Sequence, residues 1–161
     1  MEHVVHNISP VFDERSEVLI LGSFPSVKSR EARFFYGHPQ NRFWAVMAEV
    51  FGWDHVPVSV EEKRAFLLAS HVAVWDVIGE CDVIGSSDAA IRNERPNDVS
   101  VILASSPIRA VFCNGAKAHA LYCRHLLPVT GIPATRLPST SPANAASSFS
   151  SLCEAWRAVA R

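Results

Sequence analysis

The sequence lacks any long apolar segment, since no hydrophobic run approaches the roughly 18 residues that a membrane-spanning helix requires. Its first residues, Met1-Glu2-His3, have neither the basic start nor the apolar stretch of a secretory signal. Charged residues are also scarce, at 19%, whereas hydrophobic residues reach 48%, which is typical of a globular protein. We therefore expect a cytoplasmic protein without membrane contact, folded as one domain over residues 1–161.

Cysteine is sparse, and no pair has the CxxC spacing of a zinc or iron–sulfur site. The chain has four cysteines, Cys81, Cys113, Cys123 and Cys153. We expect them to be reduced and mostly buried, and we expect no bound metal and no cofactor. A GxSxG nucleophile elbow and a convincing acid–histidine pair are also missing, which argues against a serine hydrolase that uses Ser23 or Ser139.

The net charge of −1 does not by itself favour a nucleic-acid partner, but the charge is unevenly distributed. Residues 99–161 have six lysines or arginines and one acidic residue, Glu154, so their net charge is +5 and that of the first 98 residues is −6. A second basic stretch runs from Lys28 to Arg42. These stretches are either phosphate-binding surfaces or ordinary solvated faces.

Short apolar runs alternate with helical patterns along the chain. Strands are expected at 17–22, 71–77, 109–113 and 134–137, and helices at 39–52, 59–70, 98–104, 116–127 and 145–160. The segments 23–38 and 79–97 are expected to be loops. This order predicts an α/β three-layer sandwich with a four-stranded, mostly parallel central sheet and helices on both faces. Ligands bind such sheets at the carboxyl ends of the strands.

Three polar segments follow predicted strands and are expected to meet at that edge of the sheet. They are Gly22-Ser23-Phe24-Pro25, Asn114-Gly115 and Pro138-Ser139-Thr140-Ser141-Pro142. Their convergence would form a ligand pocket. The alternative is that all three are ordinary turns.

Three stretches carry a family resemblance: LILGSFP from Leu19, FYGHPQNRFW from Phe35 and LPSTSPAN from Leu137. Together with Trp75-Asp76 and Asn114-Gly115 they extend over nearly the whole chain. They resemble the uracil-DNA glycosylase superfamily, and within it the hypoxanthine-DNA (deoxyinosine) glycosylase branch. The resemblance implies a monofunctional enzyme that flips a deaminated base, expected to be hypoxanthine, out of DNA and hydrolyses its N-glycosidic bond. We expect a monomer whose partner is DNA containing that base.

Two departures from the family pattern bear on the chemistry. Ser23 stands where mismatch-specific members have asparagine, no acidic residue occurs from 19 to 30, and Ser139 stands where uracil-specific members have histidine. We therefore expect inefficient removal of uracil. In the hypoxanthine branch, the residue that matches Asn41 is the proposed catalytic residue. Asn41 is expected to orient water through its carbonyl group, and a helix cap is the alternative.

The resemblance also implies a base pocket made of Gly22, Ser23, Phe24, Pro25, Tyr36, Asp76 and Asn114. Tyr36 is expected to stack on the flipped base, unless it is a core aromatic residue. Asp76 or Asn114 is expected to recognise the base edge. Backbone N–H groups of the 22–25 turn would stabilise the departing base anion. Both motifs lack lysine, which predicts hydrolysis without strand cleavage.

DNA phosphates are expected to bind the loop before the last helix and a nearby lysine. The predicted DNA-binding residues are Lys117, Ser139, Thr140, Ser141 and Asn144. His38 and His119 are expected to be structural or to face phosphate. Two other functions stay open: a glycosylase that prefers uracil, xanthine or mispaired thymine, and a non-catalytic DNA-binding module on the same scaffold.

Overall fold

A four-stranded sheet forms the centre of the computed structural model, which describes residues 2–83 and 91–161. The strand order is β3-β2-β6-β7, and the strands are β2 (Val18–Gly22), β3 (Val72–Asp76), β6 (Ala110–Asn114) and β7 (Ala134–Leu137). All three strand pairs are parallel, so the carboxyl ends lie together at one edge. This confirms the predicted parallel sheet.

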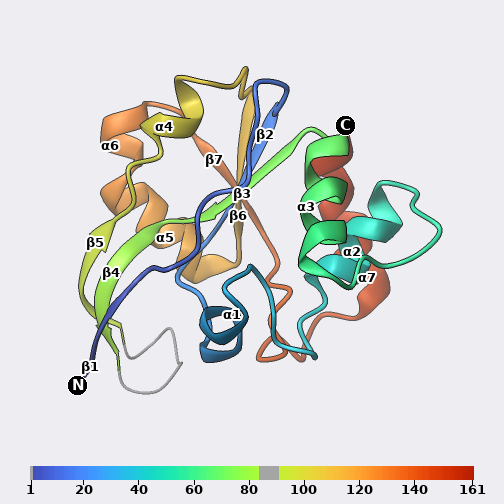
Figure 1. Cartoon of the computed structure of the whole chain (residues 1–161), viewed down its shortest axis with the longest axis horizontal. Coiled ribbons are helices and arrows are strands. Elements are labelled where there is room, and N and C mark those ends of the chain that lie inside the picture. Colours follow the sequence, from blue (N-terminus) through green and yellow to red (C-terminus); the bar gives the residue numbers. More distant parts are fainter. Residues whose placement is uncertain (1, 84–90) are drawn as a thin grey trace.

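Helices cover both faces of this sheet, as predicted (Figure 1). One face packs against α2 (Phe43–Val50), α3 (Val60–Ala69) and α7 (Phe149–Trp156). The other face packs against α4 (Ser100–Leu103) and α5 (Ala116–His125). The short α6 (Leu127–Thr130) follows α5, and the 3-10 helix η2 (Arg157–Ala160) extends α7. Alternate residues of β2 enter the two cores, Ile20 on one face and Leu21 on the other.

A second, antiparallel sheet was not predicted. It has the order β1-β4-β5 and consists of β1 (Glu2–Val5), β4 (Ile78–Val83) and β5 (Arg92–Pro96). The prediction of a loop at 79–97 is therefore wrong for the described residues. The residues of β5 are polar and mostly exposed, because an edge strand buries little, so they give no apolar pattern. Residues 84–90 of that expected loop, which include Gly85, Ser86 and Ser87, lie outside the described residues.

The segment 23–38 is also not wholly a loop, because it contains α1 (Val27–Ala32). Ser26 caps this helix by accepting a hydrogen bond from the Ser29 N–H, and Arg33 ends it in a left-handed conformation with φ of 55°. A helix of six residues is too short to show an apolar period. The helix predicted at 59–70 is confirmed as α3, and it begins with a capping box between Ser59 and Glu62.

The cysteines lie largely inside the protein, as predicted. Cys81, Cys113 and Cys153 are buried and Cys123 is partly buried. Burial raises the pKa of the Cys113 thiol to about 12, so this thiol is protonated at neutral pH. Across residues 2–83 and 91–161, no three metal-binding side chains are grouped, and no helix has the length and apolar character needed to cross a membrane.

Candidate active site

A cavity of about 550 Å³ lies at the carboxyl-end edge of the parallel sheet. This volume is within the range of small-molecule pockets. The sequence-predicted residues on its wall are Gly22, Ser23, Phe24, Pro25, Tyr36, Asn41, Asp76, Asn114, Ser139, Thr140 and Ser141. Lys117 and Asn144 are not among the lining residues. All seven residues predicted for the base pocket thus line one cavity.

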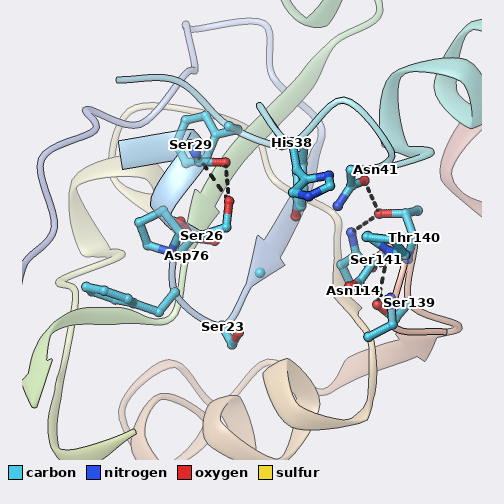
Figure 2. Close-up of a pocket in the computed structure, with 17 residues that line it drawn as sticks. Ser23, Ser26, Ser29, His38, Asn41, Asp76, Asn114, Ser139, Thr140 and Ser141 are labelled. Atoms are coloured by element: carbon cyan, nitrogen blue, oxygen red, sulfur yellow. Dashed lines mark hydrogen bonds between the residues drawn. The ribbon is translucent and has the colours of Figure 1, made fainter. Parts of the chain in front are cut away.

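Two groups of polar side chains face each other across this cavity (Figure 2). On one side Asp76 ends β3 and lies over Gly22 at the end of β2; we name these two residues the carboxylate wall. On the other side are Asn41, Thr140 and Asn114, which we name the amide wall. Among the described lining residues Asp76 is the sole carboxylate, and no lysine is present.

The amide wall is a closed hydrogen-bond network. The Asn114 amide donates to Thr140 Oγ1 over 3.0 Å, and the Thr140 N–H returns a bond to Asn114 Oδ1 at the same distance. The Thr140 hydroxyl then donates to Asn41 Oδ1 over 2.9 Å. Thr140 is fully buried, so these bonds are shielded from water. Each donor and acceptor in the chain from Asn114 to Asn41 is therefore fixed in direction.

Asn41 is held by its carbonyl oxygen and not by its amide nitrogen. Oδ1 accepts the Thr140 hydroxyl and also the N–H of Phe43 at the start of α2, each over 2.9 Å. These two bonds occupy both lone pairs, and no described residue accepts a hydrogen bond from Nδ2. Asn41 therefore bonds the first N–H of α2, but it is not the N-cap of the helix, which is Arg42 and has no side-chain capping bond. The group that it offers to a ligand is its N–H pair, whereas the sequence argument assigned this part to the carbonyl.

The loop after β7 is tied to the start of α2 by Arg42. Its guanidinium donates to the carbonyl oxygens of Ser147 and Asn144, over 2.7 and 2.9 Å, and its N–H donates to the Thr140 carbonyl. Asn144 in turn donates to the Ser139 carbonyl over 2.9 Å. Arg42 and Asn144 thus shape the loop from within and hold the amide wall together.

These contacts correct part of the predicted phosphate site. The hydroxyl of Thr140 is buried in the amide wall, so it is not available to DNA phosphates. Asn144 uses its amide to brace the loop, with bonds to Ser139 and Ser147. Lys117 is exposed on the first turn of α5, beside Gly115. Of the predicted phosphate contacts, Lys117 and the partly exposed Ser139 and Ser141 keep surfaces that DNA can reach.

The carboxylate wall depends on a close approach of backbone and side chain. A Cβ atom added to Gly22 would lie 2.4 Å from Asp76 Oδ1 and 3.0 Å from the Tyr36 hydroxyl, so only glycine fits there. Asp76 Oδ2 accepts a hydrogen bond from His6 Nε2 over 2.8 Å, and both side chains are nearly fully buried. Sequence reasoning missed His6, because nothing near it in the chain indicates a partner that lies 70 residues further on.

Aromatic rings complete the cavity. The Tyr36 ring stacks on Phe43 with centroids 4.0 Å apart, and Tyr36 has a left-handed φ of 53°, a strained value for a bulky residue. Strain of this kind gathers at functional sites. Phe24, which also lines the cavity, is buried, and the Arg30 guanidinium lies over its ring. Tyr36 therefore reaches the cavity while its ring is supported by the core.

Of the two histidines that the sequence left unassigned, one belongs to the cavity. His38 lines it, and its Nδ1 accepts the Gln40 N–H over 3.1 Å, which leaves the ring proton on Nε2. His119 lies on α5 next to Cys123 and contacts the Ala134 carbonyl, away from the lining residues. His38 thus lies at the cavity, and His119 lies away from it.

Comparison with known proteins gives consistent results. Residues 9–160 match the family model described as the uracil DNA glycosylase superfamily. The chain is 36% identical over 152 residues to a hypoxanthine DNA glycosylase of Methanosarcina acetivorans, covering 94% of each chain. A protein of the same name from Methanosarcina barkeri is 33% identical over 110 residues, covering 68% of this chain and 70% of the relative. The solution NMR structure of a candidate uracil DNA glycosylase from Methanosarcina acetivorans has a TM-score of 0.78 at 33% identity, covering 96% of this chain and 97% of that chain.

Proposed function

Because the chain belongs to the uracil DNA glycosylase superfamily, we propose that it excises hypoxanthine from DNA and leaves an abasic site. It is a DNA glycosylase, a hydrolase of N-glycosyl bonds that acts on a deaminated base. The choice of hypoxanthine is supported by the name of both Methanosarcina relatives. The observation that carries the proposal is the cavity itself, which is large enough for a flipped base and has hydrogen-bonding groups on two opposite walls.

We assign the chemical step to Asn41. One of its Nδ2–H groups donates to the oxygen of the attacking water, which keeps its second lone pair for the sugar C1′ atom. The base leaves with the bonding electron pair, and the proton that the water loses neutralises the base anion. Backbone N–H groups of the 22–25 turn stabilise the negative charge as it forms. Since no lysine is among the described lining residues, this route ends at the abasic site.

We assign recognition of the base edge to Asp76 and not to Asn114. Hypoxanthine has an N–H at ring position 1, where adenine has a lone pair, so an acceptor at that point separates the deaminated base from its parent. Asp76 Oδ1 is a carboxylate acceptor at the cavity floor. The Asn114 amide already exchanges two hydrogen bonds with Thr140. Xanthine and uracil have a comparable N–H and remain competing substrates.

We expect Tyr36 to stack on the flipped base, with a contribution of about 1–3 kcal/mol. Lys117, Ser139 and Ser141 are expected to contact the DNA backbone at the mouth of the cavity, with binding that weakens as salt rises. We also propose that residues 1–161 act as a single-domain monomer in the cytoplasm.

The proposal is tested with labelled duplexes that contain hypoxanthine, uracil, xanthine or a G·T mismatch, each followed by alkaline cleavage at abasic sites. Hypoxanthine should be released fastest. Faster release of another base would identify that base as the substrate. DNA binding without release of any base would indicate the non-catalytic module.

A further inference from the structure

His6 is a histidine buried behind the cavity that the mechanism above does not use. It follows β1, and its backbone N–H donates to the Gly79 carbonyl over 2.7 Å. Its side chain is 3% exposed and its partner Asp76 is 5% exposed. The imidazole packs edge-on against Phe24 and Trp75, with ring centroids 6.0 and 6.3 Å away. The ring therefore has little freedom to turn.

The hydrogen bonds of His6 determine which ring nitrogen holds the proton. Nδ1 lies 3.2 Å from the N–H of Ile8, which can only donate, so Nδ1 must be the acceptor. The proton then lies on Nε2, and Nε2–H donates to Asp76 Oδ2 over 2.8 Å. His6 is thus a one-way donor to the aspartate.

This arrangement decides which oxygen of Asp76 faces the cavity. Oδ2 is taken by His6, while Oδ1 lies over the Cα of Gly22. Asp76 is also fixed through its backbone, since its carbonyl accepts from the Asn97 side chain over 2.9 Å. Oδ1 is therefore the carboxylate oxygen that is left to accept an N–H from a ligand in the cavity.

We propose that His6 is a positioning residue of the glycosylase site, which holds Asp76 so that Oδ1 is a fixed acceptor for the ring N–H of a deaminated base. This rests on the proposed function, and it adds that base selection depends on a residue that does not touch the base. Second-layer donors of this kind orient ligand-binding groups in other sites.

The test uses Asp76→Asn, because the two ends of an amide differ. The rate of base release then reports which end faces the cavity. In this variant the Nε2–H of His6 still needs an acceptor, so the new amide must turn its oxygen to His6 and its NH₂ to the cavity. The NH₂ then opposes the base N–H, and single-turnover release of hypoxanthine should fall roughly a hundredfold or more. Adding His6→Leu removes the constraint, because leucine has no N–H. The amide can then turn over, and the double variant should be about tenfold faster than Asp76→Asn alone.

A residue with a merely structural role would make the double variant slower, so a double variant that is no faster than Asp76→Asn overturns the proposal. His3→Leu in the Asp76→Asn background is the matched control, since His3 also faces an aspartate, Asp82, at 2.9 Å, but outside the cavity. Recovery by this control would overturn the proposal as well.

Folding of every variant is checked by thermal unfolding. If His6→Leu does not fold, His6→Gln replaces it, because a glutamine amide donates and accepts and imposes no orientation. The wild-type protein separates the two proposals. If it releases uracil or xanthine instead of hypoxanthine, the same comparison is made on that base. If it releases no base, the proposed function fails and the role of His6 fails with it.

Discussion

The two walls of the cavity achieve rigidity in different ways. The amide wall is neutral, and its three side chains hold one another through hydrogen bonds of 2.9 to 3.0 Å. The carboxylate wall has one charged group, whose orientation depends on a single bond from His6 behind it. Asn41 offers N–H donors and Asp76 offers an acceptor. The donor of the cavity is thus fixed by a hydrogen-bond network within its own wall. The acceptor is fixed by one residue that lies behind its wall.

Removing the pocket-facing amide of Asn41 should have the largest effect. We expect Asn41→Ala to lower the single-turnover rate by about a hundredfold or more, with little change in DNA affinity, since water positioning is lost. Asn41→Asp is the sharper variant, because it keeps acceptors for Phe43 and Thr140 but has no N–H donor. It should be equally slow in base release from a hypoxanthine duplex.

Ser23→Ala and Ser139→Ala are the controls, and we expect both to retain most of the rate. Near wild-type cleavage by Asn41→Ala would mean that Asn41 has only a structural role, through its bonds to Phe43 and Thr140. Activity in Asn41→Asp would instead show that the N–H donors are not the groups required.

The carboxylate wall can be disturbed from below through Gly22. In Gly22→Ala the new Cβ would lie 2.4 Å from Asp76 Oδ1, and the carboxylate cannot withdraw easily because His6 holds its other oxygen. The rate of base release should fall by tens of fold, on the order expected for displacing a positioned group by a fraction of an ångström. Single-turnover assays and thermal unfolding separate the loss of activity from the loss of stability.

Gly131→Ala serves as the comparison, because Gly131 also occurs in a structured turn, with φ of +67° and open space around it. That variant should be less stable but equally active. Equal loss of activity in both variants would mean that unfolding explains the effect of Gly22→Ala.

Thr140→Val tests whether the amide wall needs its central hydroxyl. Valine has nearly the same shape, but it removes one of the two donors to the Asn41 carbonyl and the acceptor of the Asn114 NH₂ group. We expect a loss of about 1–3 kcal/mol in unfolding free energy and roughly a tenfold slower rate. Thr140→Ser keeps the hydroxyl and should be milder in denaturant unfolding and in the glycosylase assay. Equal behaviour of the two variants would contradict a role for the network.

The smallest effect is expected at His3 and Asp82, an exposed histidine–aspartate pair outside both walls. The hydrogen bonds that His3 donates to Asp82 and then to Glu80 raise the pKa of His3 above 6.5. Its contribution is therefore complete below this value and is lost as pH rises through the raised pKa. Hydrogen bonds from Asn93 and then His3 lower the pKa of Asp82 below 3.8, so its contribution is lost only as pH falls through that lowered value.

His3→Gln should therefore lower the unfolding temperature slightly at about pH 5.5 and not at about pH 8.5, with glycosylase activity unchanged. A loss that is the same at both pH values would contradict this assignment. A loss of activity in His3→Gln would contradict the interpretation that His6 acts on the site and His3 does not.

Local patterns in the sequence were sufficient for the parallel sheet and for the three polar segments that follow its strands, whereas the family resemblance was needed to assign Tyr36 and Asn41 to the site. Strand ends at Gly22 and Asn114 follow directly from apolar runs, and parallel strands place such ends at one edge. The second sheet was missed because β1 and β5 are exposed edge strands without an apolar pattern. The orientation of Asn41 was missed because Thr140, which fixes it, is 99 residues away in the chain.

The ties between Arg42 and the loop of residues 139–147 also have a consequence for protein synthesis. Asn41 leaves the ribosome early, but Thr140 and the carbonyl oxygens that hold Arg42 follow about a hundred residues later. During translation, which proceeds at roughly 5–20 residues per second, the amide wall is therefore incomplete for several seconds after Asn41 is made. Until Thr140 is made, Asn41 Oδ1 lacks the hydroxyl donor that holds it, so the site is completed only near the end of synthesis.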